Sequence, residues 1–304
     1  MVKNSQLLYD RGKDKKGSKI MECYKSLNEI QKEEIQAFID QCSRFDHTCQ
    51  EVYLGSEFQA YPDMHCFYLE REEEKLTGFL YLYADQKTTA EVSAWVDPQK
   101  RRQGIFTRLL GAALEEMKKF SYQKLLFKTE KAFSGAEKIL EKYPVTLSHQ
   151  EFHMLADPKA EAAEKEIPGF SIREAKEEEL GTLAEIMEAA FAEEDFEAKE
   201  HVKATYRAET ALLFTALYRE EPVGCVAVDT SGKCNYLYAL CIDPKAQGKG
   251  YGRKMLCQVI KKLRSCSTKQ ISLDVDEENQ TALPLYESCG FRQASQLVYY
   301  AMKL

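Results

Sequence analysis

The sequence predicts an α/β protein in which two copies of one mixed-sheet domain follow each other. Its 304 residues are 44% hydrophobic and 30% charged, which is typical of a globular chain long enough for two ordinary domains. Strand and helix patterns come in a mixed order rather than in strict alternation. A pattern in the second half also recurs in the first half at one constant offset. These three observations define the expected fold class.

The repeat relates residues 96–145 to residues 242–291 through an offset of 146. Behind the second Asp-Pro pair, apolar residues recur at the spacing of one helix face. Subtracting 146 from them again gives apolar residues, and the same offset takes Gly250 to Gly104 and Asp243 to Asp97. One offset for all these positions indicates a duplication. The helix positions are Met255, Leu256, Val259, Ile260 and Leu263, which lead to Leu109, Leu110, Ala113, Leu114 and Met117.

Each element of the second copy is predicted from local periodicity and turn residues. We expect strands at 170–175, 211–220, 221–232, 234–244, 270–276 and 297–303. Helices are expected at 177–191, at 197–207, directly after the glycine loop and at 280–289. The first copy shows the same order more faintly, with strands at 65–72, 76–85 and 88–97.

Composition sets the domain limits. Residues 1–20 have no clear period and are expected to be a flexible extension, with Met21 as a possible natural start. Residues 158–168 lie in a polar, charged stretch that ends in Pro-Gly, which indicates a linker. The predicted domains are therefore 21–157 and 169–304.

Several classes of protein are disfavoured by composition. No apolar run approaches the ~18 residues of a membrane span, and the polar start does not resemble a signal peptide. Ten scattered cysteines without a Cys-x-x-Cys pair favour reduced thiols and no metal site. A net charge of −7 disfavours general nucleic-acid binding. We therefore expect a cytoplasmic protein that binds neither membrane nor nucleic acid.

A positive, glycine-rich stretch stands out in this acidic chain. Residues 242–256 read IDPKAQGKGYGRKML, with three glycines two apart and four cations. A strand, a glycine turn and a helix N-terminus together form a phosphate site, because the first helical N–H groups are unpaired and the dipole favours an anion. The glycines are Gly248, Gly250 and Gly252, and the cations are Lys245, Lys249, Arg253 and Lys254.

The common phosphate-binding motifs do not fit this stretch. A Walker loop requires Gly-x4-Gly-Lys-Ser/Thr, which does not occur here. In a dinucleotide fingerprint the third glycine would come one residue later, directly after a strand. Asp274 or Asp276 could take the place of its ribose-binding acid, so spacing alone leaves a nicotinamide enzyme open.

Two segments resemble the GCN5-related N-acetyltransferase family, abbreviated GNAT. QGKGYG, residues 247–252, matches its acetyl-CoA loop Gln/Arg-x-x-Gly-x-Gly/Ala. ENQTALPLYESCGF, residues 278–291, is similar to its closing signature. The resemblance covers essentially all of 169–304. The signature positions are Asn279, Ala282, Leu285, Tyr286, Gly290 and Phe291.

This resemblance implies a fold and a cofactor site. The fold is a mostly antiparallel sheet, flanked by helices, that splays between its fourth and fifth strands. The cofactor arm would pair with backbone groups of Leu240 and Ile242 and contact Asn279. The coenzyme A pyrophosphate would lie on the amides of Gln247, Gly248, Lys249, Gly250, Tyr251 and Gly252, with Arg253 adding positive charge.

The implied activity is transfer of an acetyl group from acetyl-CoA, as co-substrate, to a primary amine by direct attack. Tyr286 occupies the place of the acid that assists the departing thiolate. The base is left open among Asp229, Asp274, His201 and a bound water. The acceptor, a small molecule or a peptide, is not defined, and neither is the oligomeric state. The alternative is a non-catalytic acyl-CoA-binding sensor.

The first copy departs from the signature. Arg101 and Gly104 are kept, but Phe106 stands where Gly252 does and Leu140 replaces Tyr286. Phe133 likewise replaces Asn279. We therefore expect turnover in the C-terminal copy, although cations near Gly104 leave cofactor binding by the first copy open. The two-copy layout is also similar to the mycothiol synthase type.

Overall fold

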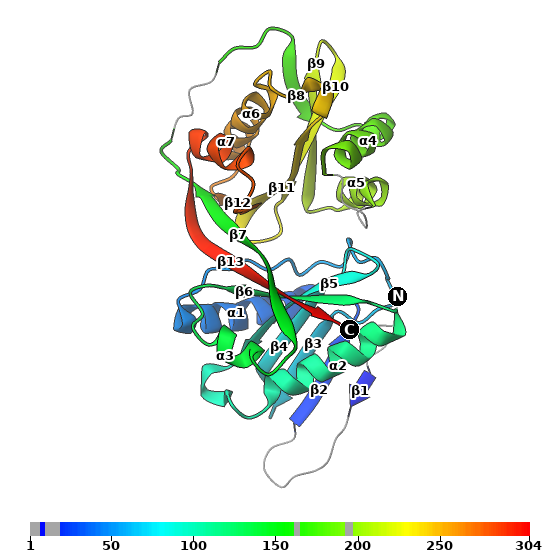
Figure 1. The fold of residues 1–304 in the computed structure, drawn as a ribbon, viewed down its shortest axis with the longest axis vertical. Helices are drawn as coiled ribbons and strands as arrows, with labels where there is room; N and C mark the ends of the chain where they lie inside the picture. The colour runs from blue at the N-terminus through cyan, green and yellow to red at the C-terminus, as the bar shows by residue number, and fades with distance from the viewer. Residues whose placement is uncertain (1–6, 10–18, 161–164, 192–196) are drawn as a thin grey trace. The chain divides into compact units, whose positions relative to one another are not determined.

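The computed structural model describes residues 7–9, 19–160, 165–191 and 197–304 (Figure 1). The chain divides into two compact units. The first unit comprises Met1–Gln50, Leu54–His149 and Leu297–Leu304, and the second comprises Glu51–Tyr53 and Gln150–Gln296.

The elements of the first half include one strand inside the segment expected to be a flexible extension. Leu7–Tyr9 pairs antiparallel with the strand that starts at Lys19, whereas residues 1–6 and 10–18 lie outside the described residues. The elements are β1 (Leu7–Tyr9), β2 (Lys19–Tyr24), α1 (Glu29–Asp46), β3 (Phe67–Glu72), β4 (Lys75–Tyr83), β5 (Thr89–Val96), the 3₁₀ turn η1 (Pro98–Lys100), α2 (Ile105–Lys119), β6 (Lys124–Glu130), α3 (Ala136–Leu140) and β7 (Val145–Ala156).

From β2 on, the second half repeats this order, except that η2, α4 and α5 stand where the first half has α1. Its elements are β8 (Phe170–Glu174), η2 (Glu177–Glu179), α4 (Leu180–Phe191), α5 (Ala198–Arg207), β9 (Ala211–Tyr218), β10 (Glu221–Asp229), β11 (Cys234–Ile242), η3 (Pro244–Ala246), α6 (Tyr251–Cys266), β12 (Gln270–Asp276), α7 (Ala282–Ser288) and β13 (Phe291–Lys303).

The offset of 146 is confirmed by the element boundaries. Adding it to the bounds of β4, η1 and β6 gives those of β10, η3 and β12. Helix α2 begins after Gly104 at φ 78°, and α6 begins after Gly250 at φ 84°. Both halves are therefore copies of one α/β arrangement.

The second unit contains the predicted splayed sheet. Its strands follow the order β7-β12-β11-β10-β9-β8. Neighbours are antiparallel except β11 and β12, which are parallel and pair only at Cys234, Asn235 and Tyr236 of β11. Beyond Tyr236 the two strands have no ladder pairs. The sheet opens between its fourth strand, β11, and its fifth, β12, as the family resemblance implies.

The last strand of each half pairs with the other half. Residues 151–155 of β7 pair with β12, and residues 297–303 of β13 pair with β6. The exchange is reciprocal and has the same register in both units. His153 pairs with Asp274, and the offset of 146 relates these two residues to Tyr299 and Lys128, which also pair. The units thus differ from the predicted contiguous domains 21–157 and 169–304, since each takes its last strand from the other half.

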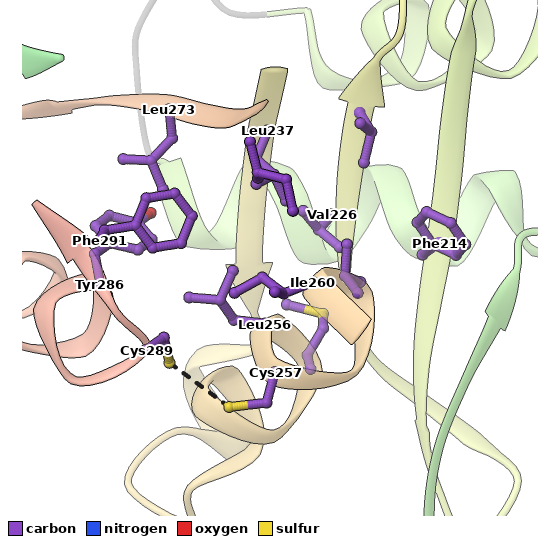
Figure 2. Packing of buried hydrophobic residues seen from close by; sticks show 14 of the residues in the cluster. Phe214, Val226, Leu237, Leu256, Cys257, Ile260, Leu273, Tyr286, Cys289 and Phe291 are labelled. Atoms are coloured by element: carbon purple, nitrogen blue, oxygen red, sulfur yellow. Dashed lines mark hydrogen bonds between the residues drawn. The ribbon is translucent and has the colours of Figure 1, made fainter. Parts of the chain in front are cut away.

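Two apolar clusters cover the two faces of the second sheet. Helices α6 and α7 pack on one face around Leu237, Leu256 and Phe291 (Figure 2). Helices α4 and α5 pack on the other face around Leu183, Val202 and Cys225. The opening between β11 and β12 therefore has a helical layer on each side. All ten cysteines are free thiols, including Cys257 and Cys289, whose Sγ atoms lie 3.7 Å apart.

Candidate active site

A β-bulge shapes the edge of β11 at the opening. The register between β10 and β11 shifts between Cys225 and Ala227, and Ala239 takes a positive φ of 50°. Tyr238 and Ala239 both pack toward α4 and α5, while Leu240 packs toward α6 and α7. Two consecutive residues on one face are the mark of a bulge, which bends a strand and ends regular pairing. The first unit has no such shift between β4 and β5.

The glycine loop has the backbone that an anion site requires. Gly248 and Gly250 have φ values of 76° and 84°, in the left-handed region where glycine is favoured. Gly250 is the N-cap of α6 and provides no side-chain cap. Residues 247–250 are exposed, so the first N–H groups of α6 are open to a ligand.

The cations of this loop are available to an anion. Lys245 and Lys249 are exposed, and within the described part of the chain neither forms an ion pair with a carboxylate. Arg253 instead reaches α7 and donates to Ser288 Oγ and, at 3.1 Å, to the Ser288 carbonyl. Gln247 donates Nε2–H to the Ile242 carbonyl at 3.1 Å, so that carbonyl is already used at the edge where the cofactor arm is expected.

Two other loop residues contact neighbouring elements. The Tyr251 ring is buried against Phe170 and Tyr218, at centroid distances of 5.5 and 5.0 Å, so only its backbone faces the loop. Gly252 lies within α6, and a Cβ there would meet Ile242 and Leu285 at ordinary distances of 3.6 and 3.7 Å. The left-handed φ values fall instead on the glycines that precede the helix.

The closing signature positions a cap and a buried phenol. Asn279 Oδ1 accepts from the Ala282 N–H at 3.0 Å and so caps the first turn of α7. Tyr286 is 8% exposed and packs edge-on against Phe291 at 6.0 Å (Figure 2). Burial raises the pKa of the Tyr286 phenol to about 12. No hydrogen bond to its hydroxyl is found among the described residues.

A polar cluster lies on the opposite face of the sheet. Asp274 of β12 is two residues beyond Ser272, the last residue that pairs with β11. Its carboxylate lies 2.6 Å from His153 Nδ1 and accepts from the Tyr236 hydroxyl at 3.2 Å. Sequence reasoning included Asp274 among possible bases but missed His153. The offset relates the copies, yet it does not reveal that β7 pairs with β12.

The other suggested bases have different roles. Asp229 accepts from the N–H and hydroxyl of Ser231, both at 2.9 Å, and thereby closes the turn after β10. His201 packs edge-on against Tyr238 at 5.9 Å, and burial lowers its pKa to about 4. Asp274 is therefore the candidate base with the best position at the opening.

Three cations around the corresponding loop of the first unit are paired with carboxylates. Lys100 pairs with Glu72, and Arg101 pairs with Asp46 through two contacts of 2.7 and 2.6 Å. Arg108 pairs with Glu70 through contacts of 2.8 and 2.6 Å. In the second unit, Ala216 and Tyr218 stand in the places of Glu70 and Glu72. The first loop thus keeps its cations but neutralises these three internally.

The opening of the first sheet is also bridged. Gln50 donates Nε2–H to Ser93 on β5 at 3.0 Å, and its backbone N–H donates to Glu130 on β6 at 2.9 Å. The parallel pairing of these strands ends at Val92, so Gln50 links them where they separate. Leu140, which stands in place of Tyr286, is buried and has no proton to donate.

Neither a metal centre nor a membrane helix is found in the ranges that the structure describes. No group of three or more His, Cys, Asp or Glu residues there could hold a metal ion. No helix among them is long and apolar enough to cross a membrane.

The sheet and the glycine loop together define an acetyltransferase-type fold. Residues 27–143 and 180–291 both match the acetyltransferase (GNAT) family. The chain therefore belongs to this family of acyltransferases, in a tandem arrangement. The parallel dinucleotide-binding alternative does not apply, because only one strand pair of the second sheet is parallel.

Comparisons with individual proteins support the tandem architecture. The mycothiol acetyltransferase of Acidothermus cellulolyticus is 46% identical over 56 residues, which cover 18% of this chain and only 17% of that protein. A GCN5-related N-acetyltransferase from Sphaerobacter thermophilus has a TM-score of 0.70 at 15% identity, covering 89% of this chain and 91% of its own. A tandem GNAT protein from the clavulanic acid biosynthesis pathway has a TM-score of 0.68 at 16% identity, with coverages of 94% and 98%.

Proposed function

We propose that the second unit transfers the acetyl group of acetyl-CoA to a primary amine. The observation that carries this proposal is the contrast between the loops before α2 and α6. Both have a left-handed glycine at the helix start. In the first loop Lys100, Arg101 and Arg108 pair with carboxylates, whereas in the second Lys245 and Lys249 have no carboxylate partner among the described residues. The pyrophosphate would bind the amides of 247–252, and the cofactor arm would follow Leu240 along the bulged edge of β11.

We assign different roles in this reaction to residues on the two faces of the sheet. Asp274 lies on the α4 and α5 face and would accept a proton from the amine as its nitrogen attacks the thioester carbon. Tyr286 lies on the α6 and α7 face. As the carbon–sulfur bond breaks, its hydroxyl would donate a hydrogen bond to the departing thiolate. With a pKa of about 12, compared with roughly 8.5 for a thiol, Tyr286 acts by this hydrogen bond rather than by full proton transfer.

The decisive experiment combines binding with turnover. Calorimetry with acetyl-CoA tests cofactor binding, and a thiol-detecting assay with a panel of primary amines tests transfer. Binding together with amine-dependent CoA release supports the proposal. Binding without release for any amine would instead favour the non-catalytic acyl-CoA sensor, and absence of binding would contradict both functions.

A further inference from the structure

His153 and Asp274 form a buried pair across the β7–β12 ladder. The two residues are ladder partners, and Nδ1 of His153 lies 2.6 Å from Oδ1 of Asp274. His153 is 4% exposed, and the Asp274 side chain is 11% exposed. When Asp274 is ionised it has no proton to donate, and the proton of this hydrogen bond then belongs to Nδ1. Tyr236 supplies the second donor, at 3.2 Å from Oδ2.

We propose that His153 is a positioning residue that holds the Asp274 carboxylate ionised and oriented at the opening of the sheet. This inference rests on the proposed function, in which Asp274 is the base. His153 lies on β7, which begins in the first half of the chain. The first half would thus contribute to catalysis by supplying a strand with a functional side chain, even without a cofactor site of its own.

Nearby carboxylates explain why Asp274 needs two donors. The next ladder pair on the same face joins Asp276 to Glu151, and Glu51 lies 3.4 Å from the Ser272 hydroxyl. Negative neighbours disfavour a further negative charge, whereas N–H and O–H donors favour it. The Nδ1–H of His153 and the hydroxyl of Tyr236 therefore oppose the charge of the surrounding acids.

The strand exchange by itself does not require this pair. At the same ladder position of the first unit, Tyr299 faces Lys128, whose Nζ lies 5.4 Å from the Tyr299 ring centroid. The register is the same, but neither ladder partner in the first unit is a histidine or a carboxylate; the His149 ring stacks on Tyr299 at 4.2 Å instead. Pairing of the exchanged strand therefore does not require a histidine and a carboxylate at this position. The His153–Asp274 pair occurs in the unit that also retains Tyr286.

The first test determines the tautomer of His153 without any enzyme assay. Long-range ¹H–¹⁵N spectra of the five histidines, with His153 assigned through His153→Asn, report the tautomer of each ring. We expect the Nδ1–H form for His153, and a change of its signals in Asp274→Asn. An Nε2–H tautomer that is unaffected by Asp274→Asn would overturn the inference whether or not the protein is an acetyltransferase.

The second test reads the pH dependence of kcat/KM with acetyl-CoA and the best amine of the panel. Removal of the donor in His153→Phe should move the lower-pH limb of the kcat/KM profile to higher pH by about one pH unit. His153→Asn, which retains an N–H donor, should restore most of that shift. Each variant is compared with wild type on the same amine. Ionisation of the amine therefore affects both kcat/KM profiles equally and does not contribute to the difference between them. Tyr299→Phe is the matched control at the equivalent ladder position and should leave the limb in place.

The outcomes separate this inference from the proposed function. If Asp274→Asn retains full turnover, the assignment of the base is wrong. If Asp274→Asn is inactive but His153→Phe only lowers the melting temperature and leaves the limb unmoved, His153 is structural and only the further inference fails. A shift in His153→Phe that His153→Asn reverses supports both.

Discussion

Arg108 on α2 and Glu70 on β3 form a two-contact ion pair of 2.8 and 2.6 Å beside the glycine that begins α2. The Glu70 side chain is only 4% exposed. Two parallel N–H donors that face one carboxylate make a strong and directional pair. The cation at this position is therefore held by protein, whereas phosphate binding would require it to be available.

We predict that each chain binds one acetyl-CoA. Three cations of the first loop are paired with carboxylates and Gln50 bridges the first opening. Lys245 and Lys249 of the second loop have no carboxylate partner among the described residues. Calorimetric titration should give a stoichiometry near one, and Gly104→Asp should leave it unchanged. A stoichiometry of two, reduced to one by Gly104→Asp, would show that the first unit still binds the cofactor.

The phenol of Tyr286 gives a second prediction. Tyr286→Phe keeps the ring that packs against Phe291, so the fold and acetyl-CoA affinity should hardly change. Turnover should fall roughly 10²–10⁴-fold if the hydroxyl assists the leaving thiolate. Because the pKa is about 12, the hydroxyl stays protonated throughout an ordinary assay range. The loss of rate should consequently be uniform between about pH 6 and 9.

The control for this variant is Tyr218→Phe. Tyr218 packs against the same apolar cluster from β9, so its variant tests whether loss of any neighbouring hydroxyl slows turnover. Equal losses in both variants, or full activity in Tyr286→Phe, would return Tyr286 to a packing role.

Sequence patterns predicted most of the fold because the dominant signals are local. Apolar residues at helical spacing identified α6, and Asp243 with Pro244 marked the turn before it. The constant offset then transferred these elements to the first copy, where periodicity alone was weaker. The β11–β12 opening followed from the family resemblance, since no residue of β11 signals by itself that the ladder ends at Tyr236.

The partners of the last strands could not be predicted in this way. Residues 151–155 and 297–303 would have the same apolar alternation with either sheet, and the offset makes the two sheets equivalent in pattern. Only tertiary pairing decides that His153 meets Asp274. The neutralised loop was missed for a similar reason, because Glu70 and Arg108 are 38 residues apart along the chain.

His201 gives a prediction about stability and pH. Burial lowers its pKa from 6.5 to about 4, so between these values the unfolded chain binds more protons than the folded one. Stability contributed by the neutral ring is complete above about pH 6.5 and is lost as the pH falls toward 4. At pH 5 the expected loss is about 2 kcal/mol relative to pH 7.

Urea unfolding followed by circular dichroism at pH 7 and pH 5 measures this loss. His201→Gln cannot take up a proton in this range and should lose about 2 kcal/mol less than wild type between the two pH values. Identical losses in wild type and His201→Gln would mean that His201 is not kept neutral by burial.

The last prediction compares Gly250→Asp with Gly104→Asp. Both glycines have positive φ, 84° and 78°, and aspartate is among the residues that tolerate this region best. An added Cβ at Gly250 meets only Ile167 at 3.7 Å, and one at Gly104 meets Nη1 of Arg108 at 3.0 Å, so the Arg108 guanidinium must shift by a few tenths of an ångström. Both variants should therefore fold, but only Gly250→Asp places a negative charge where the pyrophosphate is proposed to bind. Its acetyl-CoA affinity should weaken by about 2–4 kcal/mol, with turnover lost accordingly.

Gly250→Asn separates charge from backbone strain. Asparagine has nearly the shape of aspartate and also tolerates a positive φ, so it should weaken acetyl-CoA binding much less than Gly250→Asp. Gly104→Asp should keep turnover within a few-fold of wild type, because the loop it alters is already closed by internal ion pairs. If Gly104→Asp folds but loses more activity than Gly250→Asp, the second unit cannot be the active one.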